Sequence, residues 1–173
     1  MTEALDAALL VVRVTVGIVF IAHGVKHALG RVKTTAWFKS LGWNAPGFQW
    51  FMSTGTEIGV GILLIFGFLT SFAAAGLIGI MFVAYWTVHR FAGFFITAFM
   101  QEGIEVEGWE YVWVLAMIGA ALAISGPGSI SVDDAIGLAD QLDAWVGLAI
   151  ALAGVVLGLG LVATFWRPKT ADT

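Results

Sequence analysis

The chain has 173 residues, of which 60% are hydrophobic and 12% are charged, and its net charge is −4. Soluble domains are about 45–50% apolar and about 25% charged, so this apolar excess is more than one small soluble core can bury. We therefore expect an integral membrane protein that contacts the lipid bilayer and binds no nucleic acid. The chain has no cysteine, which excludes disulfides, thiolate-ligated iron–sulfur clusters and covalent haem attachment.

The first predicted membrane span, residues 7–29, is apolar but contains Arg13, His23, Lys26 and His27. About 20 apolar residues cross the hydrocarbon core, so the length is sufficient. Ionisable side chains inside a span are costly and need partners or water, which makes them functional candidates. The acidic N-terminus and the internal arginine do not resemble a cleavable signal, so we expect this span to be retained.

Apolar stretches of suitable length predict further spans along the chain. They cover residues 51–70, 73–90, 108–125 and 144–166. A polar connector, 30–50, separates the first two spans, and its tryptophans suit the membrane interface. The stretch 91–100 is too short to cross, and would extend the third span or lie in the interface. The expected fold is all-α: a polytopic transmembrane helical bundle.

Basic residues gather on one side of this predicted topology. With five spans, the connector, the loop after the third span and the C-terminal tail share that side, which holds Lys26, Arg31, Lys33, Lys39, Arg90, Arg167 and Lys169. The other side has no lysine or arginine outside the membrane. The positive-inside rule then places the protein in the cell (inner) membrane with its N-terminus outside and its C-terminus in the cytoplasm.

Two glycine pairs have the spacing that lets membrane helices approach closely, Gly55-xxx-Gly59 and Gly154-xxx-Gly158. Ordinary glycine enrichment in membrane helices explains either pair equally well. The last span has no ionisable residue within it, so we expect it to pack against the bundle or a partner.

The up-and-down order of the spans brings polar residues to one depth near the cytoplasmic boundary. A helix rises about 1.5 Å per residue, which puts Glu57 roughly 9 Å inside the second span. The end of the first span, the end of the third and the start of the fourth lie at the same level. The resulting candidates for ligand binding or proton relay are His23, Lys26, Glu57, His89 and Glu110.

Two interpretations of this cluster stay open. Charges of opposite sign could form a structural ion-pair network that offsets their desolvation. Alternatively, histidine and glutamate could bind a ligand or move protons. A metal site from His23, His89 and a glutamate is chemically reasonable, but the ligands follow no recognised spacing, so no metal is expected. We expect His27 to be an interfacial residue.

Arg13 lies at the opposite depth, level with the loop after the fourth span. A buried arginine needs a carboxylate or several carbonyl oxygens. Asp133 or Asp134 is the natural carboxylate in that loop. We therefore expect a structural clamp of Arg13, Ser131 and Asp133 that ties the end of the fourth span to the first.

Taken together, these residues resemble the DoxX family of small membrane proteins over about residues 9–135. The matching positions are Arg13, Gly17, Phe20, His23, Gly24, Lys26, Glu57, Gly59, Gly61, Leu63, Leu64, Gly67, His89, Gly108, Trp109, Glu110, Tyr111, Gly126, Pro127, Gly128, Ser129, Ser131 and Asp133. The resemblance implies a four-helix membrane domain over 1–135. The segment 136–173 would add an acidic loop, a fifth transmembrane helix and a short basic tail.

The resemblance also implies a link to membrane redox metabolism, because the family takes its name from a subunit of a terminal quinol oxidase and thiosulfate:quinone oxidoreductase system. It favours a redox-associated subunit that binds a quinone or similar amphiphile and works with other redox subunits. No electron carrier is visible in the chain, so enzymatic activity, as part of a membrane oxidoreductase, stays an open question. The alternatives are a non-catalytic accessory or scaffold subunit of a larger membrane complex, and a small-molecule transporter or binder. The lack of an evident inverted repeat weighs against transport.

Overall fold

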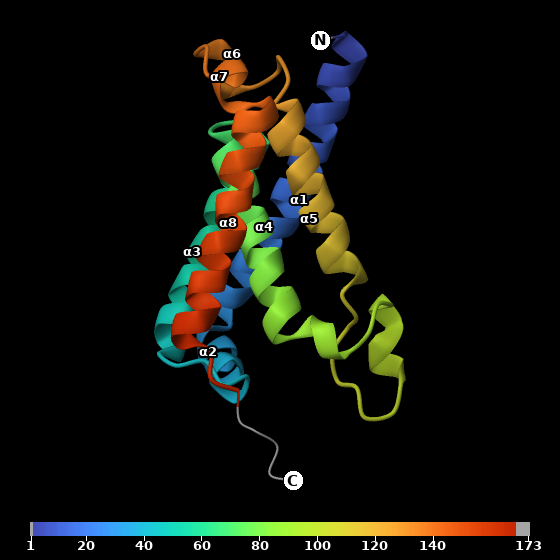
Figure 1. Cartoon of the computed structure of the whole chain (residues 1–173), viewed down its shortest axis with the longest axis vertical. Helices are drawn as coiled ribbons and strands as arrows, with labels where there is room; N and C mark the ends of the chain where they lie inside the picture. The colour runs from blue at the N-terminus through green and yellow to red at the C-terminus, as the bar shows by residue number, and fades with distance from the viewer. Residues whose placement is uncertain (1, 169–173) are drawn as a thin grey trace.

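Long helices run side by side along the molecule and form an all-α bundle (Figure 1). The computed structural model describes residues 2–168. Their elements, in order, are α1 (Glu3–Leu29), α2 (Arg31–Ser40), α3 (Pro46–Phe66), α4 (Thr70–Thr87), the 3₁₀ turns η1 (His89–Phe91) and η2 (Ile96–Met100), α5 (Glu110–Ser125), α6 (Val132–Ala135), α7 (Ala139–Leu142) and α8 (Ala144–Phe165). The predicted fold class, a helical membrane bundle, is confirmed.

Some helix boundaries differ from those predicted. The segment 30–50, predicted as a polar connector, contains the helix α2. The second long helix begins at Pro46, earlier than predicted, because the fixed φ of proline suits the first turn of a helix. The stretch 91–100 does not extend α4, which ends at Thr87. Instead, it forms 3₁₀ turns in the connection to α5.

In the described part of the chain, α1, α4 and α8 are each long and apolar enough to cross a membrane. These three helices confirm three of the predicted spans by length and composition. α5 is apolar but has only 16 residues. α3 has 21 residues, but Gln49, Thr54 and Glu57 reduce its apolar character. That α3 and α5 also cross the membrane stays a prediction.

The long helices pack in a pattern that leaves α4 at the centre. α1 lies along α3, and α4 contacts α3, α5 and α8. Leu64, Leu77 and Leu122, from α3, α4 and α5, are the largest fully buried apolar side chains. The bundle core is therefore formed where these three helices meet.

Small residues bring α8 directly onto α4. A Cβ added to Gly154 would overlap the carbonyl oxygen of Ala75, so only glycine permits this contact. Gly55 and Gly59 have no such neighbour within 4 Å, so this pair does not mediate packing within the described structure. The division of the chain near residue 135 stays a prediction.

The bundle has two chemically different ends. The end drawn at the top of Figure 1, here called the upper end, carries the start of α1, α6 and α7. The lower end carries α2 and the connection 88–109. There the backbone N–H of Asn44 donates to the carbonyl oxygen of Phe165 at 2.8 Å, and that of Arg167 donates to Gly42 at 2.8 Å. The loop between α2 and α3 is thus tied to the end of α8.

Candidate functional site

An ion pair links α1 to α3 in the lower half of the bundle. His27 Nδ1 lies 2.9 Å from Glu57 Oε2, and the side chains are 20% and 9% exposed. The two atoms are close but not aligned as a hydrogen bond, and each is buried without a hydrogen-bond partner. The two atoms face one another, so a further polar group would bind to the other side-chain atoms of the pair, His27 Nε2 and Glu57 Oε1.

Glycines allow α1 and α3 to approach closely around this pair. A Cβ on Gly24 of α1 would lie 3.2 Å from the Glu57 Cβ, which is tighter than ordinary van der Waals contact. A Cβ on Gly61 would lie 2.6 Å from the carbonyl oxygen of Gly17, so that crossing excludes any larger residue. The close helix contact explains how a carboxylate in the middle of α3 reaches the end of α1.

His27 has a different position from the one expected. The sequence predicts His27 as an interfacial residue, but the structure pairs it with Glu57. Its carbonyl oxygen also accepts a hydrogen bond from the Trp50 indole N–H at 2.8 Å. His23, one turn earlier on α1, faces a cavity instead. The spacing of the spans predicts the depth of each histidine in the bundle. The rotation of α1 about its axis determines which of them contacts Glu57.

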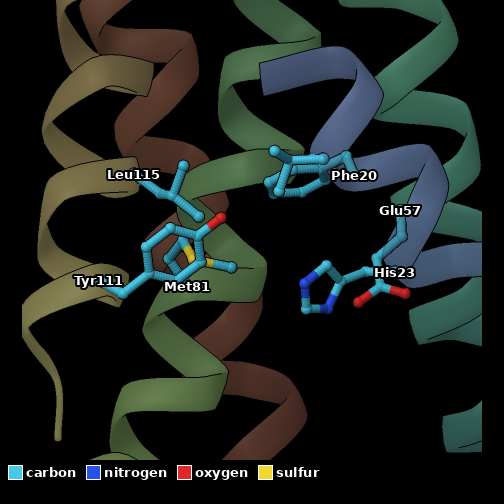
Figure 2. A pocket seen from close by; sticks show the side chains of 7 residues that line it. Phe20, His23, Glu57, Met81, Tyr111 and Leu115 are labelled. Carbon is cyan, nitrogen blue, oxygen red and sulfur yellow. The ribbon is translucent and has the colours of Figure 1, made fainter. Parts of the chain in front are cut away.

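A small cavity of about 40 Å³ lies between α1, α4 and α5, next to Glu57 (Figure 2). It is lined by Val19, Phe20, His23, Glu57, Met81, Tyr111 and Leu115. Figure 2 shows the imidazole of His23 and the ring of Tyr111 extending toward it from α1 and α5. The space suits about one water molecule, which needs the polar partners that His23, Glu57 and Tyr111 offer.

A larger groove of about 790 Å³ lies between α3, α4 and α8, and Glu57 lines it as well. The lower half has polar lining side chains: His27, Gln49, Ser53, Thr56, Thr87, His89 and Thr164. The first half of α4 lines the upper part with apolar residues: Phe72, Ala75, Gly76, Gly79 and Ile80. Aromatic and aliphatic residues such as Trp37, Phe38 and Leu161 line the lower half as well, so the groove is mostly apolar with its polar groups gathered at one end. This arrangement suits an amphiphile with a polar head and an apolar tail.

Two predicted site residues hold the connection between α4 and α5. His89 Nδ1 lies 2.8 Å from the carbonyl oxygen of Glu107. The Glu110 carboxylate accepts a hydrogen bond from the backbone N–H of Ile96 at 3.0 Å. Both side chains thereby fold the 88–109 segment back on itself.

The five predicted candidates are therefore only partly brought together. His23 and Glu57 share the small cavity, and Glu57 and His89 share the groove. Lys26 and Glu110 line neither space. Glu57 is the residue common to both spaces, which makes it the centre of the candidate site.

The two histidines considered as weak metal ligands, His23 and His89, line different spaces. Within residues 2–168, no group of three or more histidine, aspartate and glutamate side chains lies close enough together to hold a metal ion.

Sequence reasoning missed two polar residues of the groove wall, Trp43 and Gln49. Both are buried, and the indole Nε1 and the amide Nε2 have no hydrogen-bond partner. The amide between aromatic residues at the start of α3 was a visible signal. Trp43 gave no such signal, because tryptophans are common at the membrane interface, where the connector 30–50 was predicted to lie.

Arg13 is fully buried at the upper end. Its Nη1 donates to the carbonyl oxygen of Leu64 at 3.1 Å, and its Nη2 donates to that of Ile130 at 2.6 Å. Gly67, which ends α3 with φ +62°, lies against the guanidinium, and a Cβ there would overlap it. The arginine therefore joins α1 to the end of α3 and to the loop before α6.

Asp133 acts at the same end through backbone amides. Its Oδ1 accepts from the N–H of Leu69 at 2.8 Å and its Oδ2 accepts from that of Thr70 at 2.9 Å. Ser131 caps α6 by accepting from the N–H of Asp134 at 3.1 Å. The sequence favours a carboxylate as the partner of Arg13. In the structure, Arg13 donates to backbone carbonyl oxygens instead, and the Asp133 carboxylate accepts from backbone N–H groups. The clamp itself stays a prediction.

These features define a helical integral membrane protein with polar side chains gathered between its helices. Residues 8–90, from α1 to the end of α4 and the first residues of η1, match the family model described as DoxX. Residues 8–90 thus carry a DoxX family domain, as the motifs predict. The residues after Arg90 that resemble the family in sequence lie outside the range that the family model matches.

One similar protein is inner membrane protein YqjF of Escherichia coli (strain K12), which is 29% identical over 133 residues. The similarity covers 74% of this chain and 91% of that protein. It supports integral location in the inner membrane. No solved structure is significantly similar to the chain.

Proposed function

We propose that the protein binds a quinone or a chemically similar amphiphile in the groove between α3, α4 and α8. The observation that carries this proposal is the buried His27–Glu57 pair in the wall of that groove. The polar head would lie against the pair, and the tail would lie along the apolar first half of α4. The volume of about 790 Å³ supports a ligand larger than a head group alone.

The chemistry of the pair suits a quinone head. A protonated imidazole donates hydrogen bonds to carbonyl oxygens, and a carboxylate accepts them from the hydroxyl groups of the reduced form. Both groups also act as general acids and bases. His27 and Glu57 would therefore hold either form and exchange protons with it. Electrons would come from carriers on partner subunits, so we assign the protein to a redox-associated membrane component.

Retention of quinone through a gentle purification tests this proposal. The wild-type protein and the variants Glu57→Gln and Glu110→Gln are purified in mild detergent, and extracted quinones are measured by mass spectrometry. Glu110→Gln is the matched control because Glu110 lines neither the groove nor the cavity. We expect the wild type and the control to retain quinone, and Glu57→Gln to retain at least about tenfold less, since a charged hydrogen bond is worth about 1.5–3 kcal/mol.

Equal quinone in the wild type and Glu57→Gln, or none in either, would contradict the proposal. If Glu57→Gln also kept every co-purifying protein and the activity of the assembly, a non-catalytic scaffold would be the better description.

We also propose that the N-terminus lies outside and the lower end faces the cytoplasm. Within the described residues, the lysines and arginines outside the long apolar helices belong to the lower end, and Lys169 lies outside the described residues. Because the chain has no cysteine, one can be placed at Thr35 of α2 or at Asp140 of α7. A membrane-impermeant maleimide should label intact cells only at position 140. Labelling of position 35 from outside would reverse the orientation.

A further inference from the structure

Two buried hydrogen-bond donors line the groove without partners. Trp43 is 4% exposed and Gln49 is 3% exposed, and both residues line the groove. The indole Nε1 of the first and the amide Nε2 of the second have no acceptor. An unsatisfied buried donor costs about 1–3 kcal/mol, so two of them in one ligand-sized space point to an acceptor that the ligand supplies.

The local fold holds the indole in the groove wall. The backbone N–H of Trp43 donates to the carbonyl oxygen of Phe38 at 3.1 Å, and the two rings meet edge to face with centroids 6.4 Å apart. A backbone bridge joins Trp43 to Trp166 at the end of α8. Gln49 lies in the first turn of α3, which begins at Pro46. The two donors therefore sit on elements that are fixed at the lower end of the groove.

The hydrogen-bonding capacity of these groups determines what they can bind. An indole N–H only donates, so its partner must present an acceptor atom, while a primary amide both donates and accepts. The neighbouring Trp50 is different, because its indole already donates to the carbonyl oxygen of His27 at 2.8 Å. One tryptophan thus joins helices, and the other lines the groove with a buried donor that has no acceptor.

We infer that Trp43 and Gln49 form a subsite that binds the acceptor oxygens of the amphiphile's head, such as carbonyl, methoxy or ester oxygens. The inference rests on the proposed function and deepens it. The His27–Glu57 pair would contact the part of the head that exchanges protons. The Trp43–Gln49 subsite would bind neutral oxygens nearer the lower end and select an oxygenated amphiphile over a hydrocarbon of the same size.

Two radiolabelled probes test this inference by equilibrium binding to the full chain in phosphatidylcholine nanodiscs. One is a decyl-substituted dimethoxybenzoquinone, and the other is decylbenzene, which has the same tail and no oxygen. The variants are Trp43→Phe, Gln49→Met, which keeps the side-chain length, and Glu57→Gln. Trp145→Phe is the matched control, because Trp145 is 82% exposed and lines neither the groove nor the cavity.

We expect Trp43→Phe and Gln49→Met each to weaken binding of the benzoquinone about fivefold, the value of one ordinary hydrogen bond, and to leave decylbenzene binding unchanged. Trp145→Phe should bind both probes as the wild type does. If Trp43→Phe does not fold, Gln49→Met alone decides the result.

Wild-type affinity of both variants for the benzoquinone, with weaker binding by Glu57→Gln, would overturn the subsite and leave the proposed function in place. The opposite pattern is also distinguishable. In that case the wild type would bind no benzoquinone but would co-purify with phospholipid, and Trp43→Phe would co-purify with less of it. The proposed function would then fail, and the subsite would bind lipid ester oxygens.

Discussion

The two ends of the bundle use their buried polar groups differently. At the upper end, both terminal nitrogens of Arg13 and both oxygens of Asp133 are bonded to backbone groups. In the lower half, the groove-lining residues Trp43 and Gln49 each have a buried donor without an acceptor, and the His27–Glu57 pair lies beside them in the same wall. Both ends also have unpartnered atoms in residues that line neither the groove nor the cavity: Arg13 Nε and Thr70 Oγ1 at the upper end, and Thr54 Oγ1 and Arg90 Nε in the lower half.

This difference separates polar residues that build the protein from those available to a ligand. A buried charge whose hydrogen bonds are all internal stabilises one arrangement of helices and offers nothing to a third molecule. A buried pair with unused hydrogen-bonding capacity, open to a groove, carries a cost that a ligand would remove. Substitutions at the two ends should therefore affect different properties.

Arg13→Ala should have the largest effect on stability. It removes two charge-assisted hydrogen bonds, so the carbonyl oxygen of Ile130 loses this donor and that of Leu64 keeps only the backbone N–H of Gly67 at 3.2 Å. We expect a loss of about 3 kcal/mol or more, measured by denaturant titration in mixed micelles. Lys33→Ala, on the exposed surface of α2, should change stability by less than about 0.5 kcal/mol. Equal stability of the two variants would show that the upper end is not held by Arg13.

Gly67→Ala should have the next largest effect. Gly67 has φ +62°, and a Cβ there would overlap the Arg13 guanidinium. The backbone strain alone costs about 1–3 kcal/mol, and displacement of the arginine adds to it. Gly59→Ala is the matched control on the same helix, because nothing lies within 4 Å of its Cβ position. Alanine should stabilise the helix there by about 0.5–1 kcal/mol. Similar destabilisation by both would contradict the close contact at Gly67.

Glu57→Gln should have the smallest effect on stability and a large effect on ligand binding. Glutamine has nearly the same shape, and loss of the carboxylate leaves a histidine that can be neutral instead of an unpaired charge. We expect unfolding of the ligand-free variant to change by less than about 1 kcal/mol in the same titration. A loss as large as that of Arg13→Ala would mean that the His27–Glu57 pair is structural.

The fold and the depth of its polar residues could be predicted from sequence because both depend on span length and order. The long apolar stretches predicted all five long helices, and the up-and-down order predicted that His23 and Glu57 lie at the same depth. Helix rotation depends on packing at small residues such as Gly24 and Gly61, and no single span reveals it. The choice of His27 over His23 as the partner of Glu57 was therefore not predictable.

The backbone groups that bond to buried side chains could not be predicted from sequence either. The need of Arg13 for compensation could be stated from sequence, but the carbonyl oxygens of Leu64 and Ile130 carry no sequence signal. Trp43 could not be identified for a related reason. Its role depends on an N–H that has no partner after folding, and that is a property of the packed structure.

Photo-crosslinking tests the central claim most directly. A quinone probe with a photoreactive group on its head is added to the wild type and to Glu57→Gln in nanodiscs, and labelled peptides are mapped by mass spectrometry. Binding in the groove predicts labels on residues 43–57 of the wild type, displaced by excess unlabelled quinone and strongly reduced in Glu57→Gln. Labels spread over the lipid-facing surface, or equal in the two proteins, would contradict a quinone site at the lower half of the bundle.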